Sequence, residues 1–257
     1  MTSAARELLI RAVPGVPMVV AGDDLAAIIA DALDAAGMAL RSGDVLVIAQ
    51  KVVSKAEGRL VPLAGVTPSA RAAELAARVG KDARLVELIL SEADEVVRER
   101  PGILIVRNRH GLVLANAGID QSNVDHRGGE AALLLPADPD ASARAIALGV
   151  AELTGIEPAV VIVDSLGRAW RMGTAGIAIG VHGLPALVDL RGRPDLHGRA
   201  LQTSELGLAD EVAAAGSLLM GQADEGTPVV LLRGLPVMAR GGTARDLVRP
   251  EHLDLFR

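Results

Sequence analysis

The chain has 257 residues, half of them hydrophobic, a formal net charge of −6 and no cysteine. This length allows one large domain or two small ones, and the lack of cysteine excludes disulfides and thiolate metal sites. The acidic balance argues against a nucleic-acid-binding surface, which would show a basic stripe. No apolar run reaches the roughly 18 residues of a membrane helix, and Arg6 and Glu7 interrupt the stretch where a signal peptide would be apolar. We therefore expect a cytoplasmic protein without nucleic-acid or membrane partners.

Helical and strand patterns mix along the chain without strict alternation. Amphipathic patterns with capping residues predict helices within residues 23–36, 67–79, 138–155 and 204–221, the second with Thr67 as cap and Pro68 at the first helical position. Short runs rich in β-branched residues predict strands at Val45–Ala49, Ile103–Arg107, Leu112–Ala117, Val160–Val163, Gly176–Gly180 and Val229–Leu232. The segment "RNRHG" predicts a hairpin turn. The pattern favours an α+β fold with mixed or antiparallel sheets and packed helices.

The C-terminal segment differs from the rest of the chain. From Arg240 it reads "RGGTARDLVRPEHLDLFR", which is polar and begins close to a glycine pair. We expect residues 1–239 to form one domain. Residues 240–257 would then be an extended arm of that domain, packed on its body or on a partner subunit.

Polar side chains follow the first buried strand in "GDVLVIAQKVVSKAEGR". The strand delivers Gln50, Lys51, Ser54, Lys55 and Glu57. Lys51 and Lys55 are four residues apart and would share a helix face. They are two of the three lysines in the chain, and an ammonium group suits phosphate. The alternative is a solvated surface turn.

Oxygen donors follow another strand in "ANAGIDQSNV". Asp120, Gln121, Ser122 and Asn123 offer a carboxylate, amides and a hydroxyl, which are ligands that a hard cation prefers. The same residues favour an Asx turn, so both interpretations stay open.

The segment "VVIVDSLGRAWRMGTAG" holds Trp170, the only tryptophan in a chain with one phenylalanine and no tyrosine. Asp164 ends an apolar run, and Ser165 can add a hydroxyl ligand to its carboxylate. Arg168 and Arg171 can face one anionic group, or serve as a surface ion pair or as packing stems. Trp170 can wall a pocket or simply pack. We favour the pocket wall, because tryptophan and arginine are enriched at recognition sites.

A glycine-bounded loop, "LLMGQADEGTP", precedes the last predicted strand. Gln222, Asp224 and Glu225 supply oxygen ligands there, although an ordinary acidic loop would look the same. The sequence lacks GxxxxGK[ST], HExxH and GxSxG, and no GxGxxG follows a strand. These absences argue against a P-loop protein, a zincin, an α/β-hydrolase elbow and a Rossmann site.

Four segments together resemble the coenzyme F420:L-glutamate ligase family, also called F420-0:γ-glutamyl ligase. They are "GDVLVIAQKVVSKAEGR", "AGIDQSNV", "VDSLGRAWRMGTAGIAIG" and "ADEVAAAGSLLMGQADEGTPVVLLRG", and the match runs in order from about Leu9 to Leu255. The resemblance implies an α+β homodimer that adds L-glutamate to coenzyme F420-0, forming F420-1 and then γ-linked F420-2 or longer products. It implies GTP as co-substrate, held near the subunit interface, with Mg²⁺ or Mn²⁺ at two sites and K⁺ assisting.

The resemblance also implies site residues. The metal ligands would be Asp120, Asp164, Ser165 and Gln222. The nucleotide contacts would be Val16, Pro17, Met18, Val19, Gln50, Lys55, Asn123, Met220, Gly221, Gln222, Ala223, Asp224, Glu225, Gly226 and Thr227. Some relatives carry a second, nitroreductase-like flavin domain; here the sequence ends at Arg257, so we expect the single-domain form and any reductase step to belong to a separate flavin-dependent protein.

The residue chemistry is compatible with such a GTP-dependent acid–amino-acid ligase. The carboxylate of the acceptor would attack the γ-phosphate of GTP, and the amine of glutamate would displace phosphate from the acyl phosphate. Lys55 would steady a phosphate, while Arg168 and Arg171 would hold the phosphodiester or carboxylates of the acceptor beside Trp170. Two alternatives are a ligase of this fold with another acceptor, such as a folate-like molecule, and a non-catalytic nucleotide-binding protein. The expected catalytic set is Asp120, Asp164, Lys55, Arg168 and Arg171.

Overall fold

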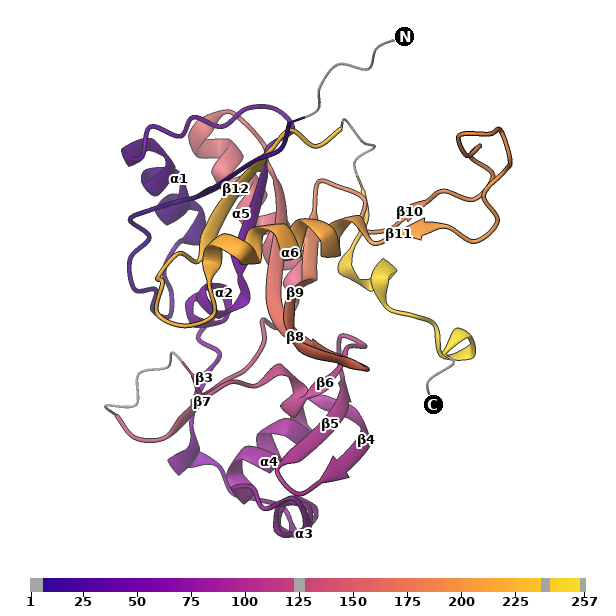
Figure 1. Ribbon diagram of the computed structural model, residues 1–257. Coiled ribbons are helices and arrows are strands. Elements are labelled where there is room, and N and C mark those ends of the chain that lie inside the picture. The colour runs from indigo at the N-terminus through magenta and orange to yellow at the C-terminus, as the bar shows by residue number, and fades with distance from the viewer. Residues whose placement is uncertain (1–6, 123–127, 237–240, 255–257) are drawn as a thin grey trace. The chain divides into compact units, whose positions relative to one another are not determined.

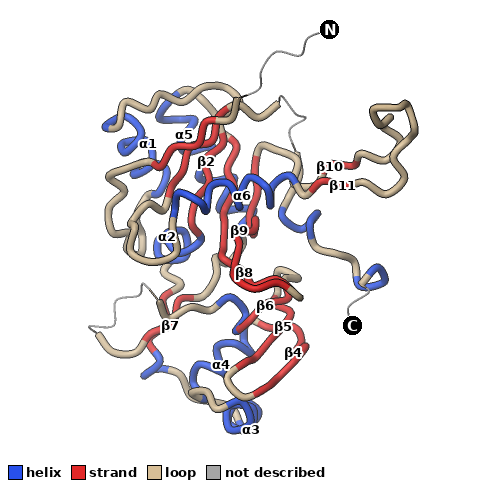
Figure 2. Tube along the Cα trace, viewed as in Figure 1, coloured by secondary structure: helices blue, strands red, loops and turns tan. Residues whose placement is uncertain are grey.

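The computed structural model describes residues 7–122, 128–236 and 241–254. The chain forms two compact units (Figures 1 and 2). The first unit comprises Met1–Val19, Asp23–Val53 and Asp138–Arg257, and the second comprises Val20–Gly22 and Ser54–Ala137. Helices accompany mixed and antiparallel sheets, which confirms the predicted α+β class.

A five-stranded sheet organises the first unit. Its order is β1 (Leu9–Ala12), β12 (Val229–Arg233), β2 (Val45–Ala49), β8 (Ala159–Arg168) and β9 (Arg171–His182). The β2–β8 pair is parallel and the other pairs are antiparallel. The central runs "VLVIA", "VVIV" and "VVLL" are buried almost throughout, because helices cover both faces of the sheet.

Helix α6 (Leu208–Met220) covers one face of this sheet, and α5 (Pro139–Thr154) packs against β8 and β9 (Figure 1). Helix α1 (Leu25–Ala35) packs on α5. The caps follow from the sequence: Asp138 accepts a hydrogen bond at the start of α5, and Gly155 takes the left-handed conformation after its end. The short helix α2 (Gln50–Ala56) begins directly after β2.

Strands β8 and β9 form a hairpin that is longer than the sequence predicts. The apolar runs indicate strands that end at Val163 and resume at Gly176, yet pairing continues to Arg168 and starts again at Arg171. The predicted strand Val160–Val163 is therefore too short, because β8 continues through Asp164 to Arg168. Backbone hydrogen bonds between two antiparallel segments extend the ladder through polar residues, because they need no apolar side chains.

The remainder of the first unit consists of short elements. Strands β10 (Val188–Asp189) and β11 (Glu205–Leu206) form a separate ribbon. The described C-terminal residues contain two 3₁₀ turns, η3 (Ala244–Leu247) and η4 (Glu251–Leu253). Ala244 is buried, and its N–H group donates to Asp140 in the first turn of α5.

The second unit combines two helices and two small sheets. Helices α3 (Ala70–Val79) and α4 (Ala83–Ser91) pack against each other. One sheet orders β4 (Ala93–Arg100), β5 (Ile103–Asn108) and β6 (Val113–Ala115), with the predicted "RNRHG" turn between the last two. The other pairs β3 (Leu60–Pro62) with β7 (Ala131–Leu133). Turns η1 (Leu63–Gly65) and η2 (Asn116–Gly118) complete the unit.

Helix α3 begins later than its sequence predicts. Ser69, not Thr67, is the N-cap, and its hydroxyl accepts a hydrogen bond from the Ala72 N–H group. Both sites offer a hydroxyl to cap a helix. The Ser69 backbone and hydroxyl also donate to Glu87 on α4, and this tertiary contact stabilises the later start.

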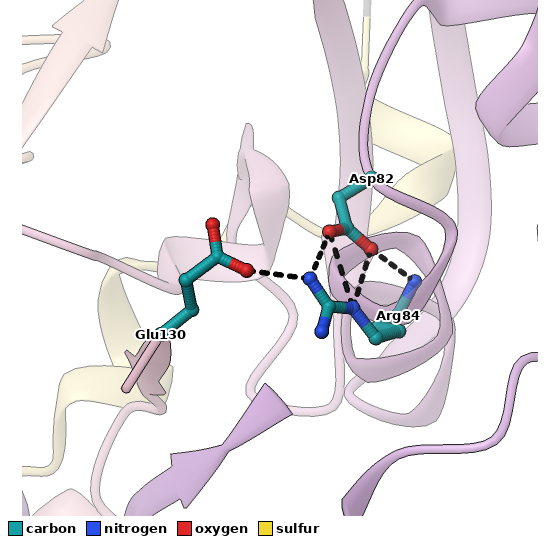
Figure 3. A network of polar contacts seen from close by, with 3 residues as sticks. All are labelled: Asp82, Arg84 and Glu130. Carbon is teal, nitrogen blue, oxygen red and sulfur yellow. Dashed lines mark hydrogen bonds and ion pairs between the residues drawn. The ribbon is translucent and has the colours of Figure 1, made fainter. Parts of the chain in front are cut away.

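A polar network marks the start of α4 (Figure 3). Asp82 accepts hydrogen bonds from the backbone and guanidinium of Arg84, which also donates to Glu130 at 2.6 Å. The guanidinium hydrogen bond holds the pKa of Asp82 at about 2, below its usual 3.8. The carboxylate therefore stays charged at the positive end of the helix dipole.

Candidate active site

One edge of the five-stranded sheet gathers most of the predicted site residues of the first unit. Parallel strands β2 and β8 end their shared ladder at the Ala49–Val163 pair, so Gln50 and Asp164 both follow at this edge. The Ala49 N–H group donates to the Pro228 carbonyl at 2.8 Å, which brings the loop 221–227 to the same edge. The tertiary structure thus unites three segments that are far apart in sequence.

Ser165 and Gln222 converge at this edge. The Ser165 hydroxyl donates to Gln222 Oε1 at 2.6 Å. Ser165 lies opposite Gly176 on β9, and a Cβ atom at Gly176 would collide with the Ala213 carbonyl and the Ser217 side chain on α6. The Ser165 side chain therefore projects from the α6 face of the sheet.

Asp164 lies on the other side of the same strand. Successive residues of a strand point to opposite faces, so Asp164 shares its face with Ile162. Ile162 pairs with Gly180, where a Cβ atom would collide with Pro139 of α5. The Asp164 carboxylate accepts a hydrogen bond from the Ser165 N–H group at 2.8 Å. Strand β8 thus offers one oxygen donor to each face of the sheet.

The loop after α6 is closed by its own hydrogen bonds. The Thr227 hydroxyl donates to the carbonyl groups of Leu219 and Met220, at 2.8 and 3.2 Å. Within the loop, the Ala223 N–H group donates to the Glu225 carboxylate at 2.8 Å. The Ala223 hydrogen bond, helped by the nearby backbone N–H groups of Glu225 and Gln222, lowers the pKa of Glu225. The sequence interpretation missed this backbone arrangement; the flanking glycines, Gly221 and Gly226, were the available signal.

The residues that follow β2 form the predicted helix. Lys51 and Lys55 both lie in α2, as their spacing indicates, and both are half-buried rather than solvated. Gln50 and Ser54 are buried polar residues. In the second unit, Glu57 accepts a hydrogen bond from the Ala137 N–H group, which gives that carboxylate a structural role.

Asp120, in the second unit, forms the Asx turn that its sequence also allows. Its carboxylate accepts hydrogen bonds from the Ser122 N–H group at 2.7 Å and from the Ser122 hydroxyl at 2.9 Å. A bridge to Leu133 fixes the backbone of Asp120. Asn123 lies outside the described residues.

Arg168, Trp170 and Arg171 lie at the tip of the β8–β9 hairpin. Arg168 lies opposite Arg171 in the register of the two strands. The Arg168 guanidinium donates a hydrogen bond to the Met172 carbonyl at 3.1 Å. Trp170 has a left-handed φ of 58° and an exposed fraction of 78%, and Met172 is 95% exposed. The indole is thus presented at the surface of this unit, without the burial expected of simple core packing.

The predicted nucleotide segment near the N-terminus precedes α1. Val19 is buried, whereas Met18 is 82% exposed and Pro17 is exposed. Val16 is half-buried. The segment therefore exposes Pro17 and Met18 at the surface and is anchored through the buried Val19.

The donor set at the sheet edge is chemically suited to a hard cation. Asp164, Ser165 and Gln222 can each offer a side-chain oxygen atom, the ligand that Mg²⁺ and Mn²⁺ prefer. Across the described part of the chain, no three histidine, aspartate or glutamate side chains form a metal-holding group. None of the described helices is long and apolar enough to cross a membrane.

These features define an α+β protein with an oxygen-rich site at a sheet edge, next to a glycine-bounded loop. A sequence profile of the F420-0:gamma-glutamyl ligase family matches residues 15–234. The coenzyme F420:L-glutamate ligase of Methanothermobacter thermautotrophicus is 48% identical over 247 residues, which are 95% of this chain and 97% of the relative. Those of Archaeoglobus fulgidus and Methanosarcina mazei are 44% and 37% identical, and each alignment covers 94% of the relative and at least 95% of this chain. The chain belongs to the F420-0:gamma-glutamyl ligase family.

Proposed function

We propose that this protein is a GTP-dependent ligase that joins L-glutamate to coenzyme F420-0 through an amide bond, and that it repeats the step to give γ-linked products. The observation that carries the proposal is the convergence of Ser165, Gln222 and the loop 221–227 at one sheet edge. The relatives, which match over nearly their full length, are named coenzyme F420:L-glutamate ligase, and this name supports the joining of L-glutamate to the coenzyme.

The reaction would proceed through an acyl phosphate. A terminal carboxylate oxygen of the acceptor attacks the γ-phosphorus of GTP, the bond to the β–γ bridging oxygen breaks, and GDP leaves. The amine nitrogen of L-glutamate then attacks the acyl carbon. Inorganic phosphate departs with the electron pair of the C–O bond, and the amine loses its proton to solvent.

The residues of β8 and the loop would hold divalent cations at two sites. Ser165 and Gln222 would bind one from the α6 face, and Asp164 would supply its carboxylate to the other. Such a cation, when bound, neutralises phosphate charge and aligns the reacting oxygens. Because these donors are few, phosphate oxygens and water would complete the coordination.

Metal binding by Asp120 and phosphate binding by Lys55 rest on the resemblance and on the chemistry of these side chains. The assistance of K⁺ and the homodimer rest on the resemblance alone. Arg168 and Arg171 would meet the anionic groups of the acceptor at the hairpin tip, and the exposed Trp170 would contact its ring system.

The test follows product mass in a mixture of purified protein, F420-0, L-glutamate, GTP and Mg²⁺ or Mn²⁺. A gain of one or more glutamyl units that depends on GTP and on the metal supports the proposal. GTP binding without a mass gain would favour another acceptor. Asp164→Ala should abolish the gain, and a retained rate would refute the metal assignment. Trp170→Phe keeps an aromatic ring and should retain part of the rate.

A further inference from the structure

Helix α6 packs directly on the backbone of strand β9 at Gly176. A Cβ atom built on this glycine would lie 2.8 Å from the Ala213 carbonyl oxygen and 2.8 Å from the Cβ and Oγ atoms of Ser217. Non-bonded heavy atoms prefer separations of about 3.5–4.0 Å, so an alanine at position 176 would push α6 away from β9 by roughly 0.5–1 Å. Gly176 does not adopt a left-handed φ. The close approach of the helix is therefore what requires a glycine here.

A hydrogen bond holds the start of α6 on the same strand. Asp210, in the first turn of α6, accepts a hydrogen bond from the Ala178 N–H group of β9 at 2.9 Å. Asp210, Ala213 and Ser217 are spaced by three and four residues, so they share one face of the helix. Helix α6 is thus fixed on β9 near its start by this bond and near its end by the contact with Gly176.

The end of α6 carries Gln222. This residue comes two positions after Met220, the last residue of the helix. The Thr227 hydroxyl donates to the Leu219 and Met220 carbonyl groups, which ties the loop 221–227 to the last turn. A displacement of the helix end would therefore also move the loop.

Strand β8 carries the partner of Gln222 directly opposite Gly176. Ser165 and Gly176 are paired in the register of β8 and β9, and the Ser165 hydroxyl donates to Gln222 Oε1 at 2.6 Å. Hydrogen bonds from hydroxyl groups span about 2.5–3.0 Å. A helix shift of roughly 0.5–1 Å would take the two side chains out of this range.

We propose that Gly176 is a positioning residue that sets the spacing between Ser165 and Gln222 by fixing how closely α6 approaches β9. The inference rests on the proposed function, in which these two side chains hold one divalent cation. Groups that orient metal ligands typically contribute about ten- to hundredfold to metal affinity. Gly176 should contribute in this way, although it has no side chain that could bind a metal.

The experiment measures the Mn²⁺ dissociation constant by electron paramagnetic resonance. We expect Gly176→Ala to bind Mn²⁺ about tenfold more weakly than the wild type, or weaker still. Gly149→Ala is the matched control, because its Cβ atom would lie 2.6 Å from the Ala26 Cβ atom, between α5 and α1. This control overpacks the same unit away from α6, so its Mn²⁺ affinity should stay within about twofold of the wild type. Equal affinities of the two variants would overturn the inference.

A second substitution separates position from stability. Ser217→Gly, added to Gly176→Ala, removes two of the three nearest contacts of the new methyl group. Mn²⁺ should then bind more tightly than to Gly176→Ala, although a glycine within a helix lowers the melting temperature. A further loss of affinity that accompanies the lower melting temperature would overturn the inference.

The same double variant serves where Gly176→Ala alone does not fold. It is then compared with Ser217→Gly alone, which differs from it only at position 176. The remaining contact with the Ala213 carbonyl should still weaken Mn²⁺ binding, by about threefold or more. Equal affinities of these two variants would contradict a positioning role for Gly176.

The NMR signal of the Gln222 side-chain amide is a readout that needs no metal. It should shift in Gly176→Ala and stay in place in Gly149→Ala. The proposed function is tested separately by product mass. Glutamate addition by the wild type, without weaker Mn²⁺ binding by Gly176→Ala, refutes only the positioning role. A shifted signal with weaker Mn²⁺ binding, but no glutamate addition by the wild type, refutes only the ligase.

Discussion

Asp140 connects three parts of the first unit through one carboxylate oxygen. Its Oδ1 atom accepts hydrogen bonds from the Val181 N–H group on β9 at 2.7 Å and from the Ala244 N–H group at 2.9 Å. Strand β9 is the outermost strand of the sheet. Asp140 therefore accepts a hydrogen bond from a backbone N–H group that has no neighbouring strand to bond with. The same atom anchors the described C-terminal residues, 241–254, through Ala244.

Asp140→Ala should lower the free energy of unfolding by about 2–4 kcal/mol. The substitution leaves two N–H groups without an acceptor, and each buried unsatisfied donor costs about 1–3 kcal/mol. Both Val181 and Ala244 are buried, so water cannot readily replace the carboxylate. Asp140→Asn is the matched control, because its amide oxygen can accept both hydrogen bonds. We expect that variant to lie within about 1 kcal/mol of the wild type.

Urea unfolding measures these differences, and amide hydrogen exchange at Val181 and Ala244 locates them. The pH dependence adds a second test. Burial raises the pKa of Asp140 above its usual 3.8, and the charges of Asp138 and Asp246 raise it further. The stabilisation from this shift is complete below pH 3.8 and is lost as pH rises through the folded-state pKa. The wild type should therefore lose stability relative to Asp140→Asn across that window. Equal unfolding free energies for the alanine and asparagine variants at neutral pH would refute this account of Asp140.

Three further substitutions test the packing and the hairpin. Gly216→Ala places a Cβ atom 2.6 Å from a Val47 methyl group; overpacking should outweigh the helix propensity gained and lower stability by about 1–2 kcal/mol, measured by urea unfolding. Asp44 is 1% exposed and accepts two hydrogen bonds from Arg233, at 2.7 and 2.6 Å. Asp44→Ala should cost about 3–5 kcal/mol, and a loss below 1 kcal/mol would contradict a structural role for the pair. Trp170→Gly relieves the left-handed strain at a cost in chain entropy. Its melting temperature should stay near that of the wild type. If the rate of glutamate addition, followed by product mass, nevertheless falls, the indole acts in substrate binding and not in stability.

The sequence by itself determined the elements whose signals are local. The apolar run Val45–Ala49 is a strand with the predicted limits. Asp138 caps α5, and Gly155 ends it. Lys51 and Lys55 share a helix as their spacing indicates. Such features depend on side chains within one turn of each other, so the sequence contains what their prediction requires. The family resemblance was equally available, because it depends on the order of motifs.

Tertiary structure alone decided how distant segments pair. The polar half of the β8–β9 hairpin has no hydrophobic pattern, because the opposite strand supplies its hydrogen bonds. The contact between Ser165 and Gln222 spans 57 residues, and no local pattern encodes it. Residue types indicated which chemistry this chain can perform, and the packing of the sheet and α6 brought Ser165 and Gln222 within hydrogen-bond distance.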